Sequence, residues 1–156
     1  ALGDRVNKNT ASMGVAFTSC TVPAAGRPTF EIGPNEIEMG VGIHGEPGRR
    51  REKFKPADAI CKDLLDAILA DLRPADGAQC LLHVNGFGGT PLMELYLLYH
   101  AARKRLEREG LKVTRSLVGS YTTSLEMAGG SLTLTLLDSE LTRLWDAPVH
   151  TAALHW

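Results

Sequence analysis

The segment Ser131 to Leu137 (SLTLTLL) alternates leucine with serine or threonine. This alternation is typical of a β-strand with one apolar face and one polar face. The apolar face needs a cover, and the segment Pro56 to Leu72 is suited to that because its apolar residues recur at three- and four-residue intervals on one side of a helix. Together the two segments predict a β-sheet with helices packed on it, which is an α/β fold.

The rest of the chain adds elements of the same two kinds. Its 156 residues fit one domain, so residues 1–156 are expected to form a single α/β domain around a mixed sheet. Thr90 is expected to cap the long helix predicted over Pro91–Glu109, and Gly110 is expected to end it. The polar segment Leu2–Asn9 is expected to be the end of a helix. The predicted strands are Met13–Cys20, Glu36–Ile43, Gln79–Val84 and Lys112–Val118, the further helices are Pro91–Glu109 and Asp138–Trp145, and Thr21–Asn35, with three prolines and two glycines, is predicted to be a loop.

Composition limits the classes of partner. Seventeen Lys and Arg against eighteen Asp and Glu give a net charge of -1, so nucleic acid and anionic membranes are disfavoured as partners. No apolar run approaches the roughly 20 residues that a membrane-spanning helix needs, and a soluble, cytoplasmic protein is expected. Three cysteines, without CxxC spacing, argue against a disulfide framework and a structural zinc site. Cys20, Cys61 and Cys80 are therefore expected to be buried, small apolar residues.

The densest cluster of unusual residues is Gly40–Gly48 (GVGIHGEPG), which places His44 where a predicted strand gives way to a turn. Ligand sites of α/β sheets tend to lie at strand ends. The flanking glycines, Gly45 among them, leave space around the imidazole for a small ligand, and Glu46 is a candidate either to orient the ring or simply to cap the turn. The alternative is that the glycines make a tight turn and that His44 is an ordinary histidine with no ligand.

Two other features favour a structural interpretation. The turn Asn85–Thr90 is rich in glycine and has a geometry that can hold phosphate, but no Lys-Ser or Lys-Thr pair follows its last glycine. The basic run Arg49–Lys55 is typical of solvated surface, although its position after His44 leaves open a role in docking an anionic partner. No metal site is predicted, because the remaining histidines lack i, i+4 spacing: His83, His100, His150 and His155.

Five short motifs occur in order along the chain: Cys20–Gly26 (CTVPAAG), Gly40–Gly48, Gly89–Tyr96 (GTPLMELY), Ser124–Gly129 (SLEMAG) and Leu144–Thr151 (LWDAPVHT). In this order they resemble the second half of the substrate-binding subunit of dihydroxyacetone (glycerone) kinases. The resemblance covers essentially the whole chain. It implies that the chain is the second, carboxyl-terminal α/β domain of a two-domain dihydroxyacetone-binding subunit, whose N-terminal domain has no counterpart in these 156 residues.

The resemblance also implies a catalytic residue. In the family, the histidine of the Ile-His-Gly-Glu-Pro-Gly motif binds the ketone covalently as a hemiaminal, and the matching residue of this chain is His44. Gly45 and Glu46 are the neighbouring substrate-binding residues of that motif. The bound ketone is then phosphorylated on a terminal hydroxyl, so the implied activity of the whole protein is that of a phosphotransferase acting on dihydroxyacetone.

The resemblance further implies which components lie outside this chain. By this resemblance, the chain is expected to bind no cofactor itself. ATP or another phosphorylated donor, with magnesium, is expected on a helical nucleotide-binding domain or subunit. The other partners implied are the N-terminal domain and a second copy in a homodimer. Two alternatives stay open, namely a kinase for another short keto sugar such as erythrulose and a noncatalytic module that senses the ketone or mediates assembly. The phosphoryl donor, ATP or a phosphotransferase system, also stays open.

Overall fold

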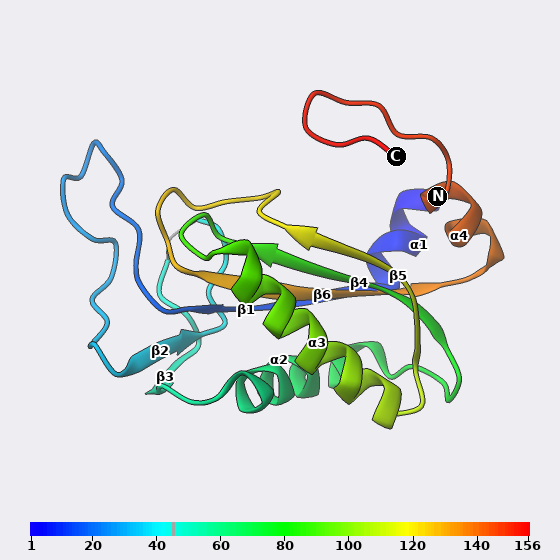
Figure 1. The fold of residues 1–156 in the computed structure, drawn as a ribbon, viewed down its shortest axis with the longest axis horizontal. Helices are drawn as coiled ribbons and strands as arrows, with labels where there is room; N and C mark the ends of the chain where they lie inside the picture. Colours follow the sequence, from blue (N-terminus) through cyan, green and yellow to red (C-terminus); the bar gives the residue numbers. More distant parts are fainter. Residues whose placement is uncertain (45) are drawn as a thin grey trace.

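The computed structural model describes residues 1–44 and 46–156 and contains one six-stranded sheet (Figure 1). The strands lie in the order β3-β2-β1-β6-β4-β5. The elements along the chain are α1 (Leu2–Lys8), β1 (Thr10–Ala16), β2 (Glu36–Met39), β3 (Arg50–Lys53), α2 (Ala57–Leu72), β4 (Gln79–Gly86), α3 (Leu92–Arg108), β5 (Lys112–Gly119), β6 (Gly129–Leu137) and α4 (Ser139–Trp145).

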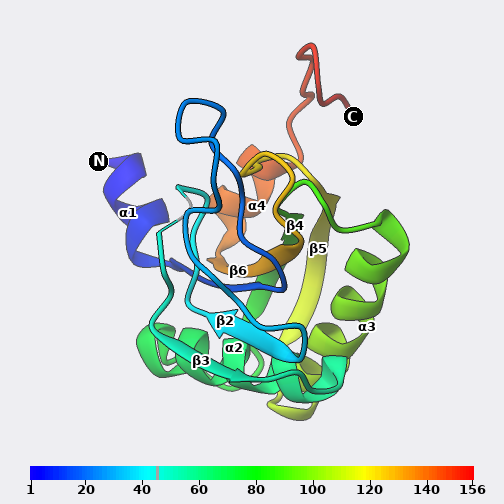
Figure 2. The ribbon, with the colours of Figure 1, turned by 90° about the vertical axis from the view of Figure 1, so that its left-hand side faces the viewer.

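The sheet is mixed, as the sequence predicts. Strands β4 and β5 are parallel, and the other neighbouring strands pair antiparallel. Strand β6 lies between β1 and β4 and is antiparallel to both, so β1, β4 and β5 run in the same direction. The carboxyl ends of these three strands therefore meet at one end of the sheet, where the loops of residues 17–35 and 40–49 also lie (Figures 1 and 2).

Helices α2 and α3 cover one face of the sheet (Figure 1). Helix α2 packs on β1 and β6, and α3 packs on β4 and β5. The alternation in β6 is confirmed, because Leu132 and Leu134 are fully buried beneath the helices. Burying one leucine side chain contributes about 1.5–3 kcal/mol. The intervening threonines lie on the opposite face, where Thr133 Oγ1 lies 2.6 Å from the Ser12 hydroxyl on β1.

Two predicted strand boundaries are wrong. Strand β1 begins at Thr10, which pairs with Thr135 of β6, and it ends at Ala16. Strand β2 stops at Met39, four residues before the predicted end. Gly40 ends it with a φ of +83°, a left-handed conformation that favours glycine and turns the chain out of the sheet. The apolar spacing continues past Gly40, but the residues after it belong to a loop.

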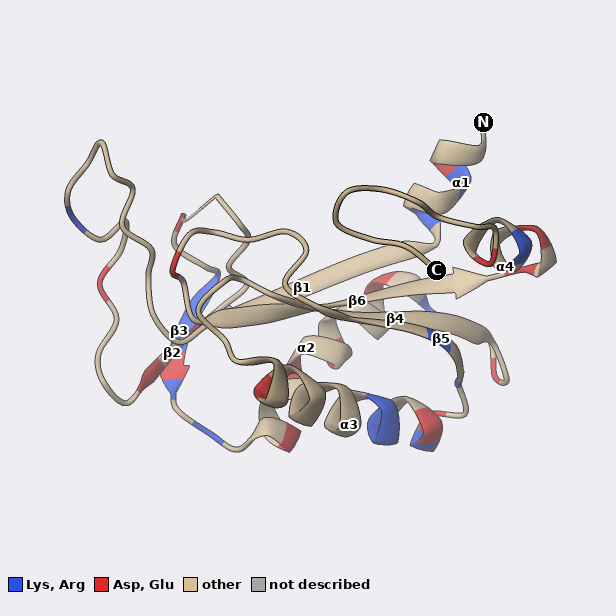
Figure 3. Ribbon diagram, turned by 45° about the horizontal axis from the view of Figure 1, so that its top comes forward, with Lys and Arg blue, Asp and Glu red and all other residues tan. Residues whose placement is uncertain are grey.

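Strand β3 is absent from the sequence prediction, because four consecutive charged residues (RREK) conceal it. It forms the edge of the sheet and pairs antiparallel with β2. Its basic side chains face acidic partners: Arg51 Nε donates to Glu38 at 3.0 Å, and Arg50 pairs with Glu52. Figure 3 shows blue and red segments side by side on β2 and β3. Ion pairs therefore engage Arg50, Arg51 and Lys55 of the basic run within the protein.

The predicted cap of the long helix is also wrong. The N-cap of α3 is Pro91, and among the described residues no side chain caps the helix. The Thr90 hydroxyl instead donates to the carbonyl oxygen of Gly129 and accepts from the amide of the same residue, both at 2.7 Å. Thr90 thus joins the start of α3 to the start of β6.

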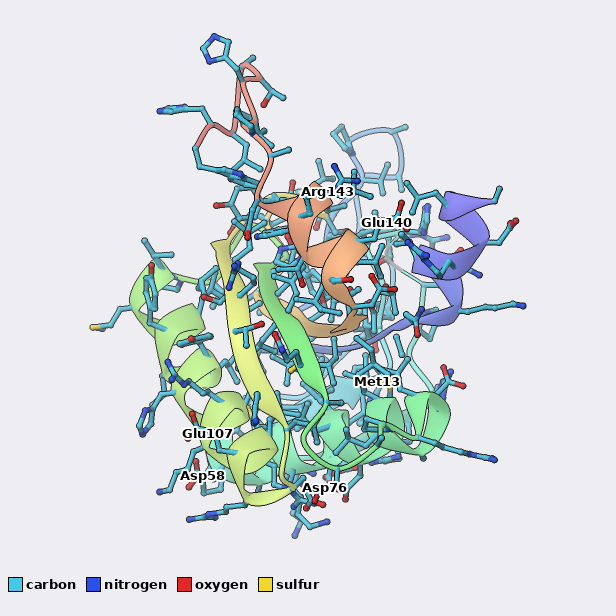
Figure 4. The ribbon with its side chains drawn as sticks, turned by 90° about the vertical axis from the view of Figure 1, so that its right-hand side faces the viewer. Met13, Asp58, Asp76, Glu107, Glu140 and Arg143 are labelled. Carbon is cyan, nitrogen blue, oxygen red and sulfur yellow. The ribbon has the colours of Figure 1, made fainter. Side chains whose placement is uncertain are left out.

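The last helix, α4, lies at the opposite end of the sheet, beside α1 (Figures 1 and 4). Asp138 caps α4 by accepting a hydrogen bond from the amide of Leu141 at 2.8 Å. Arg5 of α1 pairs with Glu140 of α4 at 2.5 Å, which ties the two helices together. No helix among the described residues is long and apolar enough to cross a membrane.

Candidate functional site

Residues 40–49 form the loop of the β2–β3 hairpin, and this loop carries His44. Backbone hydrogen bonds fix both of its ends. The amide of Gly40 donates to the Gly14 carbonyl of β1 at 2.7 Å, and the amide of Arg49 donates to the Met39 carbonyl at 2.7 Å. The loop is therefore attached to the middle of the sheet, while its central residues lie outside it.

Two of the predicted site residues, His44 and Glu46, are exposed in this loop. Gly45 lies outside the residues that the structure describes. An exposed imidazole in a turn is accessible to a small molecule from solvent. The structure places His44 and Glu46 in one loop, as their spacing requires, and their roles stay predictions.

A small apolar cluster supports the loop from beneath. Its buried members come from five separate segments of the chain, and Ile43, the residue before His44, packs against it half-buried. Val41 anchors the loop in the cluster and is 3% exposed. The buried members are Ala16, Cys20, Phe30, Val41, Phe87 and Met127.

A cavity of about 290 Å³ opens between this loop and the sheet. A larger cavity, of about 840 Å³, lies at the other end of the sheet beside α4 and contains none of the predicted site residues; Arg143 on its wall is labelled in Figure 4. Its position far from His44 gives it no part in the chemistry of that residue. The smaller cavity is lined by Ser12, Met13, Gly14, Gly40, Val41, Gly42, Ile43, Arg49, Phe87 and Ser131.

The glycine-rich turn after β4 packs backbone against backbone. A Cβ atom on Gly88 would overlap the carbonyl oxygen of Leu125, and one on Gly89 would overlap that of Glu126. The amide of Gly89 already donates to Met127 O at 2.9 Å, and that of Phe87 donates to Gly129 O at 3.2 Å. These contacts account for the glycines structurally and leave the two amides unavailable to phosphate.

The described residues do not fit a magnesium nucleotide. No group of three or more His, Cys, Asp or Glu side chains is arranged to hold a metal ion in the described part of the chain. In the turn after β4, the amides of Phe87 and Gly89 are already bonded to backbone carbonyl groups.

Of the other histidines, His83 lies half-buried on β4 beside Tyr121, with ring centroids 5.8 Å apart. Its Nε2 has no hydrogen-bond partner among the described residues, and burial lowers the pKa of the imidazole. His100 is exposed on α3, and His150 and His155 face each other in the carboxyl-terminal segment with ring centroids 6.4 Å apart. All three cysteines are free and buried, as predicted.

Sequence reasoning missed Glu126 as a residue of this region. Its Oε1 accepts a hydrogen bond from the amide of Thr21 at 2.7 Å, across 105 residues of sequence. Only the resemblance drew attention to the two motifs that contain these residues. Nothing in their local pattern indicates that they meet, because the contact depends on how the sheet brings the end of β1 beside the start of β6.

Comparisons with known proteins agree with this fold. Residues 1–153 match the model of the Dak1 domain. The chain is 41% identical to the dihydroxyacetone-binding subunit DhaK of the PEP-dependent dihydroxyacetone kinase of Escherichia coli K12, over 99% of this chain and 50% of that protein. It is 46% identical to the DhaK subunit of PTS-dependent dihydroxyacetone kinase 1 of Listeria innocua, over 90% of this chain and 43% of that protein.

Longer relatives and solved structures extend the comparison. The L-erythrulose 1-kinase of Mycolicibacterium smegmatis is 40% identical over 96% of this chain and 27% of its own. A structure of the dihydroxyacetone kinase operon co-activator DhaQ superposes with a TM-score of 0.87 at 34% identity, over 94% of this chain and 46% of that one. The dihydroxyacetone kinase of C. freundii, in complex with AMP-PNP and Mg²⁺, gives a TM-score of 0.71 at 29% identity, over 90% of this chain and 26% of that one.

The chain thus spans about half the length, or less, of the curated relatives that it matches. The match to the family model runs through nearly every residue, and the mixed sheet with its His44 loop lies entirely within it. This chain belongs to the Dak1 domain family, whose characterised relatives include kinase subunits that bind dihydroxyacetone.

Proposed function

We propose that this chain is the ketone-binding half of a kinase subunit that phosphorylates dihydroxyacetone, and that His44 holds the ketone covalently. The observation that carries the proposal is the position of His44, which is exposed on a loop fixed to the sheet at both ends and supported by a buried apolar cluster. The names of the E. coli and Listeria relatives supply the ketone. An anchored, accessible nucleophile is what covalent capture of a small molecule requires.

The capture step balances without a co-reactant. The lone pair of a neutral imidazole nitrogen of His44 adds to the ketone carbon, and a new C–N bond replaces the π bond of the carbonyl group. The electron pair of that π bond moves to the oxygen, which takes up a proton, while the other ring nitrogen loses its proton. No water leaves, and the product is a hemiaminal. Protonated His44 has no free lone pair, so capture requires the neutral ring.

This chemistry selects ketones over polyols of similar size. Glycerol has nearly the same shape as dihydroxyacetone but no carbonyl carbon for His44 to attack. A pocket that only tolerates an isostere gives modest discrimination, whereas a bond that only one ligand can form gives much more. Covalent capture also fixes the terminal hydroxyl for in-line attack on a phosphoryl group.

The phosphoryl donor is assigned to another domain or subunit. The described residues show no site that fits a magnesium nucleotide, and the chain covers only 26% of the C. freundii kinase whose structure contains AMP-PNP and Mg²⁺. A donor carried by a second, helical domain or subunit would have to reach the end of the sheet where His44 lies. The complete subunit is proposed to be a homodimer and to act in the cytoplasm.

Two alternatives have specific support. The fold match to the operon co-activator DhaQ, with a TM-score of 0.87, favours a noncatalytic module that senses the ketone. The identity of 40% to an L-erythrulose 1-kinase favours a four-carbon keto sugar as substrate. Transfer of phosphate to dihydroxyacetone by the full-length protein with its nucleotide-binding partner would exclude the sensor, and relative rates would rank the two ketones.

The proposal is tested in the full-length protein that contains this chain. His44→Ala should lose most of its affinity for dihydroxyacetone while keeping the fold, because His44 is exposed and supports no core contact. His44→Asn should do little better, since an amide nitrogen is not nucleophilic. Ketone affinity is measured by titration calorimetry and folding by circular dichroism. Unchanged affinity in both variants would contradict the proposal.

A further inference from the structure

Two motif segments that the proposed function leaves without a role meet at the end of the sheet near the His44 loop. The segment of residues 18–30 follows β1, and the segment of residues 120–128 precedes β6; Figure 2 views this end of the molecule. Four hydrogen bonds between described residues join them. Three involve side chains: Thr21 N donates to Glu126 Oε1 at 2.7 Å, Ser124 Oγ to Cys20 Sγ at 3.4 Å, and Ala128 N to Thr18 Oγ1 at 2.8 Å. The fourth joins the two backbones, from Thr18 N to Ala128 O at 3.2 Å.

The turn that presents Glu126 is strained and tightly held. Leu125 adopts a φ of +52°, which is costly for a residue with a Cβ, and its side chain is 53% exposed. The amide of Ser124 donates to Phe87 O at 2.8 Å, and Met127 N donates to Ser124 O at 3.1 Å. Strain of this kind persists only where the surroundings fix the backbone, and it is typical of functional regions.

The two segments reach the His44 loop through side-chain packing. Cys20 of the first segment and Met127 of the second are both buried members of the apolar cluster. Val41 and Ile43 of the hairpin loop pack on the same cluster. A displacement of the first segment would therefore loosen the support on which Ile43, and next to it His44, depends.

We propose that Glu126 is a positioning residue for ketone capture, holding residues 18–30 against the cluster that supports the His44 loop. The inference rests on the proposed function, since it assigns Glu126 a role through His44. This role requires no contact between the Glu126 carboxylate and the ketone. The carboxylate acts through the Thr21 amide, which it fixes at 2.7 Å.

The charge of Glu126 strengthens its hydrogen bond with the Thr21 amide. Hydrogen bonds from its own backbone amide and from that of Thr21 lower the pKa of the carboxyl group, so it is ionised at neutral pH. A hydrogen bond from an amide to a carboxylate is shorter and stronger than one between neutral groups. A neutral glutamine can still accept the same hydrogen bond, but less strongly.

The test compares Glu126→Ala with Glu126→Gln in the full-length protein and its nucleotide-binding partner. Loss of a hydrogen bond to a charged group should raise the KM for dihydroxyacetone about tenfold in Glu126→Ala, with the rate at saturating ketone little changed. Glu126→Gln should recover most of the loss, because its amide oxygen can accept from Thr21. Glu107→Ala, which removes an exposed glutamate near the end of α3 and outside the five motifs, is the matched control and should behave as wild type.

The outcomes separate this inference from the proposed function. If Glu126→Ala lowers the melting temperature but leaves the KM for the ketone at the control value, Glu126 is merely structural and the inference is wrong, while the His44 proposal stands. If His44→Ala leaves ketone affinity unchanged, both are wrong. Should Glu126→Ala fail to fold, Glu126→Asp replaces it. Its shorter carboxylate cannot reach Thr21 in the same geometry, and an unchanged KM in this variant would equally refute the inference.

Discussion

Replacing Gly14 with alanine should displace the His44 loop from the sheet. The added Cβ would overlap the carbonyl oxygen of Val41 and lie 2.9 Å from Cζ of Phe87. The carbonyl belongs to the backbone, and the Phe87 ring is 1% exposed, so neither can move aside without disturbing the cluster beneath the loop. Overpacking of a close-packed site costs about 1–3 kcal/mol.

Gly42→Ala is the matched control, because it lies in the same loop, nearer to His44, and its added Cβ would meet no atom of the described residues within 4 Å. Both substitutions restrict the unfolded chain equally, so the difference between them isolates the packing cost. Gly14→Ala should therefore be less stable than Gly42→Ala by about 1–3 kcal/mol, which for a domain of this size is a fall in melting temperature of about 2–12 °C.

Urea denaturation followed by circular dichroism measures the free energy of unfolding of both variants. In the full-length protein, Gly14→Ala should also weaken ketone binding, while Gly42→Ala should not. Equal stability of the two variants would refute the close contact between β1 and the loop, and with it the account of how the loop is held.

Three further predictions concern groups away from the loop. Burial lowers the pKa of His83 in the folded protein, so protonation favours the unfolded chain. The free energy of unfolding should be highest above about pH 6.5 and fall as the pH drops below it, and subtracting the pH profile of His83→Leu should isolate this contribution; identical profiles would contradict it. Burial raises the pKa of Cys61 to about 12 and that of Cys80 to about 11, so neither should react with Ellman's reagent in the native protein, whereas all three thiols should react in urea. Calorimetry of the isolated chain should detect no binding of magnesium ATP, and micromolar binding would instead implicate the turn after β4.

Much of the fold could be predicted because its strongest patterns are local. The leucine alternation of β6 and the helical spacing of α2 each reflect one buried face, and both elements occur where the sequence indicates. Strand β3 lacks such a pattern, since an edge strand of charged residues is stabilised by cross-strand ion pairs such as Arg51 with Glu38. Those partners are known only once β2 and β3 are paired.

The candidate site divides in the same way. His44 stands out in the sequence because glycines surround it, and the family resemblance supplies its chemistry. The predicted role of Thr90 is wrong, because its hydroxyl forms hydrogen bonds with Gly129, which is 39 residues away. Helix-capping rules consider only residues near the helix in sequence, so they could not predict this partner. Glu126 carries no local signal either, since its partner Thr21 lies at the other end of the chain.

Carbon-13 NMR of dihydroxyacetone labelled at the ketone carbon tests the central claim most directly. Mixed with the full-length protein, the labelled carbon should lose its carbonyl resonance and give a bound signal in the range of tetrahedral carbons, because the imidazole nitrogen of His44 adds to it without loss of water. The bound signal should be absent in His44→Ala and should fade as the pH falls below the usual range of a histidine pKa, about 6.5. A bound ketone that keeps its carbonyl resonance, or a tetrahedral signal that survives in His44→Ala, would contradict covalent capture by His44.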